Sequence, residues 1–400
     1  MSEGITLGDV LDGIETGKSF QTSEILARSD ELGVLKVSAV SWSEFLPNEA
    51  KALAGDYTPA ESHRVRQGDL LISRANTREL VGAVVHVEHD YPMRLLSDKT
   101  LRLIVDEDCA SKDYLLFALR SPQAREHIEH FATGTSDSMR NISQDVIKAI
   151  PLWLPPLPEQ RQIAACLKAQ QVEVETARQA AQVQLQDAAL LRQRLLWQAF
   201  DALADVPRKA LGEWARTTSG STPSRGDKRY WSPAEIPWVK TGEVAFAPIS
   251  RTEEAISKQA LTECSLKLLP PQTVLIAMYG QGKTRGQSAI LEIEATTNQA
   301  CFAILPNDTW DADFLHHWLM ASYDYLRGLS DGRGGNQANL NGGLLNALEI
   351  PAPDIDNQRR IVAQLKQQLA EADALRIALE QQLRDLDALP QRILALAFEN

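Results

Sequence analysis

The segment Ala277–Thr284 has the residue types and spacing of a nucleotide-binding phosphate loop. Its letters, AMYGQGKT, place Gly280, Gly282 and Lys283 directly after the apolar run Val274–Ala277. A phosphate loop must lead into a helix, because the free N–H groups of the first helical turn bind the anion. The residues that follow, RGQSAILEIEA, instead alternate apolar and polar side chains as a strand does. The pattern therefore predicts a hairpin tip rather than an ATP site.

Four histidines could suggest metal chemistry, but their spacing argues against it. His127 and His130 lie three residues apart on a predicted helix and could share one face, yet no third ligand follows nearby. His316 and His317 are adjacent, so a helix would point the two rings in different directions. We therefore predict that the chain holds no metal ion.

The sequence also lacks the motifs of enzymes that modify or cleave DNA. It has no Asn/Asp-Pro-Pro-aromatic tetrapeptide of amino-methyltransferases, no glycine signature for adenosylmethionine and no nuclease-type carboxylate pair followed by lysine. A Gly-x-Ser-x-Gly nucleophile elbow is also missing. We predict that this chain contributes no catalytic residue.

What remains is a set of loops rich in side chains that bind nucleic acids. Arginine, asparagine and glutamine bind base edges in pairs of hydrogen bonds, while lysine, serine and threonine bind phosphates. In the first half of the chain the candidates are Lys18, Ser38, Arg74, Asn76, Arg78, Ser138, Arg140 and Asn141. In the second half they are Thr222, Ser224, Arg225, Lys228, Arg229, Lys240, Tyr279, Gln281, Lys283, Arg285, Arg333, Asn336, Gln337 and Asn339. Because such loops recur in both halves, recognition is favoured over ordinary solvated surface.

The elements that must position these loops occur twice in the chain. Residues 159–200 align with residues 357–398 without a gap, and 19 of the 42 aligned pairs are identical. Apolar residues recur in both copies mainly at three- and four-residue steps, which predicts two long helices whose narrow apolar stripes need a partner helix. Each helix would be about 60 Å long. Pro390 is expected to kink or end the second helix.

The duplication extends into the segments before the helices. Lys36 and Gly82 recur as Lys240 and Gly286 at the same offset, and short β-type runs alternate with helical stretches in both halves. Proline-rich hinges at 149–160 and 349–358 separate these segments from the helices. We therefore predict an α+β fold with a first globular domain (1–150), a hinge and long helix (151–203), a second globular domain (204–350) and a second hinge and helix (351–400).

Composition limits the possible functions. The chain has 400 residues, of which 44% are hydrophobic and 24% charged, as in ordinary globular proteins. Neither a run of 18 apolar residues nor a basic-then-apolar leader occurs, so we expect a cytoplasmic protein. The net charge of −12 means that any anion-binding surface must be local. Cys109, Cys166, Cys264 and Cys301 share no metal-type spacing and are expected to be buried thiols.

Three stretches closely resemble the specificity subunit of type I restriction–modification systems. They are IPLWLPPLPEQRQIAACL at 150–167, its copy IPAPDIDNQRRIVAQL at 350–365, and SGSTPSRGDKRYWSPAEIPWVKTGEV at 219–244. The resemblance covers essentially the whole chain, and the Pro-Pro-Leu-x-Glu-Gln-x-x-Ile motif is its most specific part. The second copy has Asp-Asn-Gln where Pro-Glu-Gln is usual, and the first domain lacks a Ser/Gly-x-Thr-Pro opening.

The resemblance implies a function and a set of partners. Each variable domain would be a target recognition domain that reads one half of a split, asymmetric DNA sequence. The long helices would pair as an antiparallel coiled coil, set the unread spacer and dock two modification subunits. Restriction subunits would join the complex, and adenosylmethionine, ATP and magnesium would bind the partner subunits rather than this chain. The candidate partner-binding residues are Gln160, Arg161, Ile163, Leu167, Gln358, Arg359, Ile361 and Leu365.

Two other functions are compatible with the sequence. A protein-only scaffold, in which paired helices hold two partners and the globular domains bind peptides, would suit the negative charge. An ATPase would need Lys283 as its phosphate-binding lysine. We expect DNA reading.

Overall fold

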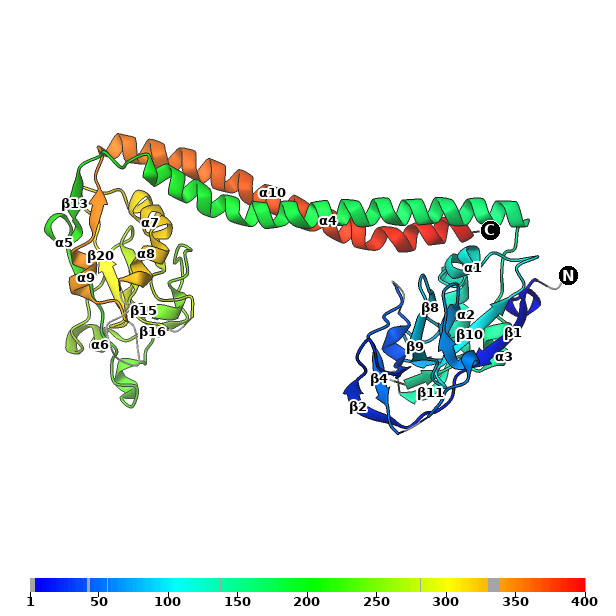
Figure 1. The fold of residues 1–400 in the computed structure, drawn as a ribbon. Coiled ribbons are helices and arrows are strands. Elements are labelled where there is room, and N and C mark those ends of the chain that lie inside the picture. The colour runs from blue at the N-terminus through cyan, green and yellow to red at the C-terminus, as the bar shows by residue number, and fades with distance from the viewer. Residues whose placement is uncertain are drawn as a thin grey trace. The chain divides into compact units, whose positions relative to one another are not determined.

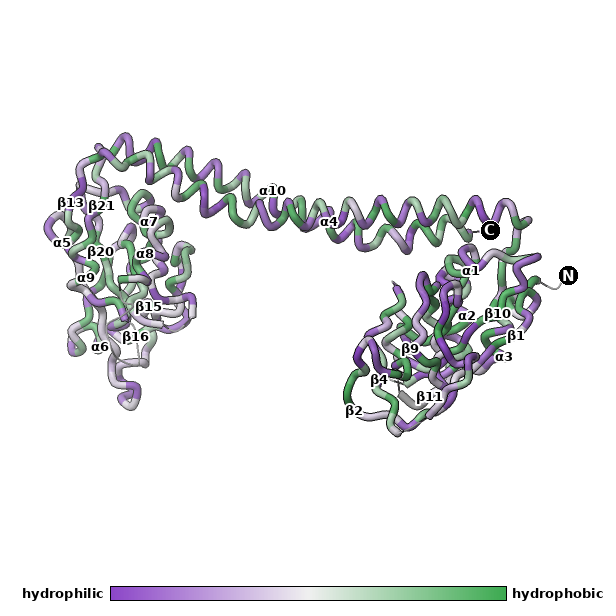
Figure 2. Tube along the Cα trace, viewed as in Figure 1, coloured by the Kyte–Doolittle hydropathy of each residue, from purple (hydrophilic) through white to green (hydrophobic). Residues whose placement is uncertain are grey.

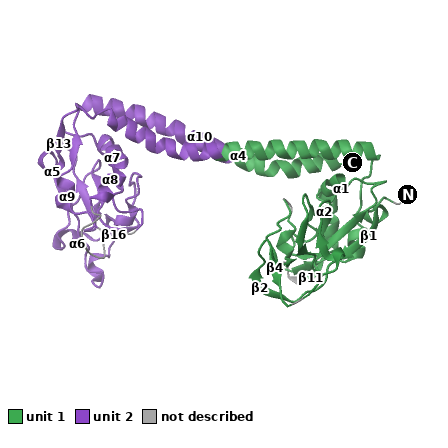
Figure 3. Ribbon diagram, in the orientation of Figure 1, with its two compact units in different colours: residues 1–182, 382–400 green, residues 183–381 purple. Residues whose placement is uncertain are grey.

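The computed structural model describes residues 4–41, 44–55, 57–136, 139–280, 282–329 and 339–399. The chain divides into two compact units (Figure 3). Unit 1 combines Met1–Gln182 with Gln382–Asn400, and unit 2 is Val183–Gln381. Each unit contains a globular part and a stretch of two paired helices. We call residues 4–156 the first head and residues 202–354 the second head.

The first head is built on a four-stranded antiparallel sheet. Its strands, in the order β1-β10-β6-β8, are Leu11–Thr16, Thr100–Val105, Leu70–Ser73 and Val84–His86. Alternating residues of β6 enter separate cores: Leu70 and Ile72 pack against the helices, whereas Leu71 packs on the opposite face. Three helices accompany the sheet: α1 (Lys112–Ala118), α2 (Pro122–Phe131) and α3 (Gln144–Lys148).

Two further sheets, of five and three strands, belong to the described part of the first head. The order β2-β4-β3-β9-β5 joins Thr22–Leu26, Ala50–Leu53, Gly33–Leu35, Tyr91–Leu95 and Arg64–Val65. The order β11-β12-β7 joins Thr133–Ser136, Met139–Asn141 and Ala75–Asn76. Short 3-10 turns lie at Leu7–Val10, Val37–Ala39 and Glu61–His63.

The second head repeats this architecture. Its main sheet, β14-β20-β17-β18, joins Thr217–Ser219, Cys301–Ile304, Val274–Ala277 and Ser288–Ile290. The registers correspond, because Leu70 lies opposite His86 in the first head and Val274 opposite Ile290 in the second. The predicted duplication and the α+β class are confirmed.

The remaining elements of the second head are short. The sheet β16-β15-β19 joins Glu254–Ile256, Ile236–Val239 and Thr296–Thr297, and the pair β13-β21 joins Arg208–Ala210 and Glu349–Pro351. The helices are α5 (Leu211–Trp214), α6 (Lys258–Glu263), α7 (Ala312–Ala321), α8 (Tyr323–Gly328) and α9 (Gly342–Asn346). Further 3-10 turns lie at Lys228–Tyr230 and Thr241–Glu243.

One close backbone approach recurs in both heads. A Cβ on Gly17 would lie 2.0 Å from the carbonyl oxygen of Leu96, and a Cβ on Gly220 would lie 1.8 Å from that of Thr297. Neither position can accept a side chain. Gly17 therefore does in the first head what the glycine of the Ser-Gly-Ser-Thr-Pro opening does in the second, although the rest of that opening is missing.

The long helices are α4 (Leu157–Asp201) and α10 (Ile355–Phe398). Both mix hydrophobic and hydrophilic residues along their length (Figure 2). In unit 1 they lie side by side and antiparallel (Figure 1): Arg178 pairs with Asp387 at 2.9 Å, while Leu167 shares a core with Leu394 and Phe398. These ends of the helices thus form part of the first head's core.

Unit 2 shows the same helix pairing. Arg192 binds Asp373 at 2.9 Å, and Phe200 shares a core with Val362 and Leu365. The predicted antiparallel pair is therefore present in each unit. Pro390 was expected to kink or end the second helix. It does not end the helix, because α10 continues through Pro390 to Phe398. Leu394 and Phe398 are buried in the first head's core, which stabilises the turns beyond the proline.

The cysteines differ from expectation. All four are free thiols, but Cys301 alone among them is buried, whereas Cys109 and Cys264 are half-buried and Cys166 is exposed on α4. Cys166 faces solvent because the buried stripe of that helix passes through Ala164 and Leu167 instead. Among the helices of the described residues, none is long and apolar enough to cross a membrane.

Helix α7 contains two buried histidines. His316 and His317 are each 7% exposed, and their ring centroids lie 5.4 Å apart. Burial, followed by the neighbouring His317, lowers the pKa of His316 to about 4. The first head has Leu116 and Phe117 at the equivalent positions of α1.

These histidines predict a pH-dependent stability. An unfolded chain protonates His316 below its ordinary pKa of 6.5, whereas the folded chain resists protonation until about 4. The contribution of His316 to the free energy of unfolding should therefore be nearly constant above pH 6.5 and fall by about 3 kcal/mol towards pH 4. Urea unfolding of wild type and His316→Leu between pH 7 and pH 4.5 tests this. The variant should show a shallower slope, the remainder coming in part from His317, whose pKa burial also lowers, and an unchanged slope would contradict the assignment.

Candidate nucleic-acid interface

The small sheet of the first head gathers predicted DNA-contacting residues from distant parts of the sequence. Arg140 on β12 lies opposite Asn76 on β7, and Asn141 lies opposite Ala75. The N–H of Ile142 donates to the carbonyl of Arg74 at 2.9 Å, which extends the pairing. Residues more than 60 positions apart in the sequence thus come together on one short sheet.

Asn76 lies at the centre of this group. It is 8% exposed, and its Oδ1 accepts the N–H of Thr77 at 2.9 Å. Its Nδ2 has no hydrogen-bond partner among the described residues. An unpaired buried amide donor is costly, so its presence suggests a ligand acceptor. Arg78, two residues on, is exposed and pairs with Glu129 at 3.4 Å.

The other candidates of the first head lie outside this sheet. The Lys18 ammonium lies 5.5 Å from the centroid of the Tyr57 ring. Ser38 donates to Glu49 at 2.6 Å, and Lys36 binds the same carboxylate at 2.6 Å. These two hydrogen bonds, that of Lys36 first, lower the pKa of Glu49. Ser138 falls outside the described residues.

In the second head, Arg225 belongs to an aromatic cluster. Its guanidinium lies 4.0 Å from the centroid of the Trp231 ring and 5.0 Å from that of Trp238. The two tryptophan rings meet nearly perpendicularly, with centroids 5.2 Å apart. Glu254 accepts two hydrogen bonds from Arg225, and this pairing is the largest cause of the lowered pKa of Glu254. The cluster borders a surface recess of about 430 Å³, which Lys228 also lines.

The neighbouring cations are also paired within the protein. Arg229 binds Asp227 at 2.7 Å, and Lys240 binds Glu253 at 2.5 Å and Glu254 at 3.2 Å. These carboxylates, Glu253 first, raise the pKa of Lys240. The pair of Lys240 with Glu253 corresponds to that of Lys36 with Glu49. A phosphate that binds these cations must therefore compete with carboxylates.

Two polar candidates of the same loop are also engaged. Thr222 donates its hydroxyl to the side chain of Gln299. The carbonyl of Ser224 accepts the indole N–H of Trp231 at 3.0 Å. The side chains of Ser224 and Lys228 remain exposed at the surface.

The segment that resembles a phosphate loop is a hairpin tip, as predicted. Strand β17 ends at Ala277 and pairs antiparallel with β18, so no helix follows the loop. Tyr279 and Lys283 are exposed at this tip. Arg285 is 8% exposed, so the prediction that it reads DNA at the surface is wrong for this conformation: the residue packs inward beside Arg327, which donates to its carbonyl at 3.1 Å.

Four candidates fall outside the described residues: Gln281, Arg333, Asn336 and Gln337. Asn339 is described and half-buried, directly before Leu340. The N–H of Leu340 donates to the carbonyl of Met278 at 3.0 Å, which places Asn339 beside the hairpin. This bond corresponds to that between Ile142 and Arg74 in the first head.

The two glutamines of the helical motif are structural. Gln160 is fully buried; its Oε1 accepts the N–H of Ser111 at 2.9 Å, and its Nε2 donates to the carbonyls of Cys109 at 3.0 Å and Pro155 at 2.8 Å. Gln358 repeats this arrangement in unit 2. Each glutamine joins the start of a long helix to the loop before α1 or α7.

Partner contact by these glutamines, predicted from the motif, is therefore corrected. The amide groups of Gln160 and Gln358 form their hydrogen bonds within the chain and are not available to a partner. Leu167 and Leu365 lie in the cores. Ile163 and Ile361 are partly buried against the same cores. Of the eight residues, only Arg161 and Arg359 are exposed.

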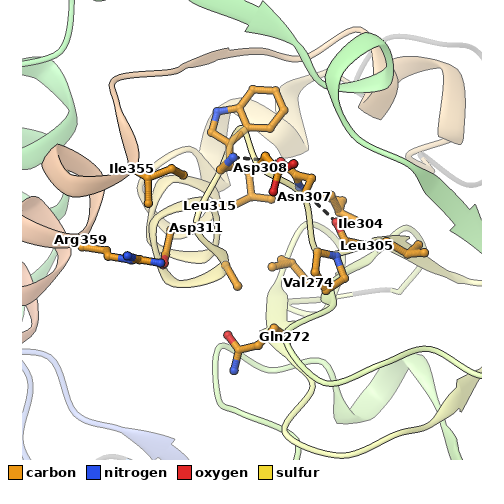
Figure 4. Close-up of a pocket in the computed structure, with 13 residues that line it drawn as sticks. Gln272, Val274, Ile304, Leu305, Asn307, Asp308, Asp311, Leu315, Ile355 and Arg359 are labelled. Carbon is orange, nitrogen blue, oxygen red and sulfur yellow. Dashed lines mark hydrogen bonds and ion pairs between the residues drawn. The ribbon is translucent and has the colours of Figure 1, made fainter.

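A cavity of about 420 Å³ lies beside Arg359 (Figure 4). Its lining combines Val274, Leu305 and Ile355 with the polar residues Asn307, Asp308 and Asp311. Arg359 binds Asp311 at 3.4 Å. Among the described residues, no group of three or more His, Cys, Asp or Glu side chains could hold a metal ion, and the candidate pair on α2 has His127 hydrogen-bonded to the carbonyl of Val146 at 3.1 Å.

Comparison with known proteins identifies the second half of the chain. Residues 205–385 match the family model described as the type I restriction modification DNA specificity domain. This stretch is a type I specificity domain. The resemblance that the sequence motifs carry is thereby confirmed.

Curated relatives agree with this specificity domain. The chain is 29% identical over 167 residues to the type I restriction enzyme EcoEI specificity subunit of Escherichia coli. It is 33% identical over 162 residues to the MjaIX specificity subunit of Methanocaldococcus jannaschii. The matches cover 42% and 39% of this chain, and only 28% and 35% of those relatives.

Solved structures share the fold of the specificity subunit over the whole chain. The HsdS subunit from Thermoanaerobacter tengcongensis has a TM-score of 0.67 at 20% identity, covering 100% of this chain and 98% of that one. A structure described for the complex assembly and conformational transition of the type I R-M system has a TM-score of 0.63 at 21% identity, with the same coverage. At these identities the likeness concerns the fold.

Proposed function

We propose that the chain is the DNA specificity subunit of a type I restriction–modification complex and reads a split, asymmetric target. The observation that carries this proposal is one scaffold used twice with different surface residues. At equivalent places the first head presents Asn76 and Arg78, whereas the second presents the hairpin tip with Tyr279 and Lys283. Equal scaffolds with unequal side chains suit the reading of two different half-sites.

The free amide of Asn76 supports base reading by the first head. An asparagine bonds an adenine through two hydrogen bonds, donating from Nδ2 and accepting at Oδ1. In this chain Oδ1 already accepts the N–H of Thr77, while Nδ2 has no partner among the described residues. Arg140 lies opposite it on the same sheet and Arg74 directly precedes strand β7, and both could bind phosphates or guanine.

Catalysis and cofactors would belong to the partner subunits. Two modification subunits would bind adenosylmethionine and receive the flipped adenine, and restriction subunits would hydrolyse ATP with magnesium. The exposed Arg161 and Arg359, at equivalent positions of the two helices, are suitable docking residues. Such a complex would work in the cytoplasm and would supply the positive surface that this acidic chain lacks.

A protein-only scaffold is the second candidate. The internal pairing of Arg225, Arg229 and Lys240 favours it, because these cations are neutralised without DNA. An ATP site at Lys283 is disfavoured by the strand that follows the loop.

Methylome sequencing distinguishes DNA reading from a scaffold. The chain is expressed with the modification subunits of its system in a host free of other adenine methylation. Modified adenines should then fall in one split motif with a spacer of fixed length. A strain that lacks only this chain should show none. The absence of any shared motif in the complete strain would instead support the scaffold.

The paired helices would set the spacer length. Inserting four residues after the exposed Ala180 should lengthen α4 by about 6 Å. Because B-DNA rises about 3.4 Å per base pair, the methylated motif should gain about one or two spacer positions. Both half-sites should stay the same. Replacing four exposed residues there by alanine, at unchanged length, is the control, and a changed half-site with the original spacer would contradict this role.

A further inference from the structure

Each unit has a cavity at the same place, where the head meets the long helices. The cavity of unit 1, of about 320 Å³, is lined by Phe45, His86, Glu88, Asp113 and Lys168. The cavity of unit 2, of about 330 Å³, is lined by Phe246, Ile290, Glu292, Asp313 and Lys366. Neither cavity contains a residue that we assign to DNA reading.

Four positions of the two linings correspond to each other. His86 ends β8 and Ile290 ends β18 at matching register positions, and Glu88 and Glu292 follow each of them by two residues. Asp113 and Asp313 are the second residues of α1 and α7. Lys168 and Lys366 are an identical pair of the duplicated helices. The cavities are therefore one site, present twice.

Some lining residues have changed between the copies while others have not. Leu116 and Arg120 of the first cavity correspond to His316 and Met320 of the second. The glutamate, the aspartate and the lysine are retained, and each cavity also contains a phenylalanine, although Phe45 and Phe246 are not at equivalent positions of the two halves. Because the heads differ so widely elsewhere, these three retained residues indicate a shared task rather than the packing of a common core.

The retained glutamate has no structural role that would explain it. Glu88 and Glu292 are exposed at the rims, and neither carboxylate has a hydrogen bond or ion pair among the described residues. The aspartates are already engaged: Asp113 lies 3.3 Å from Nδ1 of His86, and Asp313 binds Lys366 at 2.7 Å. Each lining contains a lysine, Lys168 or Lys366, but among the described residues neither lysine pairs with the glutamate, which can therefore accept a further cation.

The aromatic rings are also suited to a cation. The ring of Phe45 lies 5.2 Å from that of Tyr91, centroid to centroid, and the ring of Phe246 lies 5.4 Å from that of Tyr323. The face of such a ring attracts an ammonium or guanidinium group, and a nearby carboxylate adds a charge-assisted hydrogen bond. A DNA phosphate, in contrast, would be repelled by the glutamate.

We propose that each cavity receives an arginine or lysine side chain of the same partner protein, so that two copies bind, one on each unit. The partner is the modification subunit of the proposed function, on which this inference rests. The glutamate at the rim pairs with the incoming cation, and the phenylalanine lies beneath it. Docking at the junction of head and helix would couple a bound partner to the head of its own unit.

Native mass spectrometry of the full chain with the co-expressed modification subunit tests the proposal. Wild type should carry two modification subunits. Glu88→Lys and Glu292→Lys should each weaken one of the two binding steps by about tenfold or more, and the double variant should weaken both. Glu294→Lys, an exposed change two residues from Glu292, is the matched control and should behave as wild type.

The outcomes separate the two proposals. If wild type and all variants bind two modification subunits equally well, the cavity proposal is wrong and the proposed function stands. If wild type binds none, the proposed function fails and the cavity proposal fails with it. Circular dichroism and thermal unfolding of each variant show that the exposed substitutions leave the fold intact, so that lost binding is assigned to the cavity.

Discussion

Replacing residues 204–350 by the corresponding head of another specificity subunit should change one half of the methylated motif completely. The heads have the same sheet order, and one core of the second head, which includes Val239 and Leu275, lies wholly within residues 204–350, so a foreign head can occupy the same place between the long helices. Because base contacts of each head would specify only its own half-site, the other half and the spacer should remain as in wild type. Methylome sequencing of both strains measures this.

The reciprocal exchange is the control for this swap. A foreign head in place of residues 1–150 should change the opposite half of the motif and again preserve the spacer. A swap that alters both halves at once, or neither, would be inconsistent with one head reading one half. The junctions at 204 and 350 leave Gln358 and its hydrogen bond to Pro353 in the recipient chain, whereas the partners of its other two hydrogen bonds, Asp311 and Thr309, come from the incoming head.

Gln358→Leu should lower the free energy of unfolding by about 3–5 kcal/mol. The leucine is similar in size but leaves the N–H of Asp311 and the carbonyls of Thr309 and Pro353 without partners in a dry interior. Gln160→Leu should have the same effect in unit 1, since it bonds the equivalent groups. Urea unfolding at neutral pH measures both.

The neighbouring glutamines provide matched controls. Gln162 and Gln364 lie on the same two helices and are exposed, so their replacement by leucine should change the free energy of unfolding by less than about 0.5 kcal/mol. A loss below about 1 kcal/mol in Gln358→Leu would mean that water can replace the amide there. The motif glutamine would then need another explanation, such as contact with a partner.

Much of the fold could be predicted because its determinants are local. The repeated apolar steps of 159–200 and 357–398 predict the helices, and their match predicts the duplication. The strand pattern after Lys283 predicts the hairpin and rules out a phosphate loop. Such signals need only the order of residues along one element.

The candidate site was less predictable because it depends on residues far apart in the sequence. Nothing near Arg225 in the sequence shows that Glu254 neutralises it, or that Trp238 lies against it. Asn76 and Arg140 become neighbours only because strands β7 and β12, which lie far apart in the sequence, pair in one sheet. Glutamine in a surface-type motif also suggested exposure, whereas three hydrogen bonds bury Gln160.

One useful signal was present in the sequence. Glu49 follows Lys36 at the same interval as Glu253 follows Lys240, and both pairs form ion pairs. A comparison of the two halves that looked for equal spacings between charged residues, and not only for identical residues, could therefore have found these carboxylate partners. The same comparison relates the linings of the two cavities.

The composition of the units has a consequence for synthesis on the ribosome. Val183–Gln381 is a continuous segment, whereas the other unit needs Gln382–Asn400 to complete it. Leu394 and Phe398 fill the first head's core, so that core stays open until the last of these residues has emerged. The unit whose residues are synthesised first can thus complete its folding only after the other unit has been synthesised, whereas domains usually fold in the order of synthesis. A nascent chain halted at residue 381 would expose the apolar surface that these side chains cover, and chaperones would encounter it there.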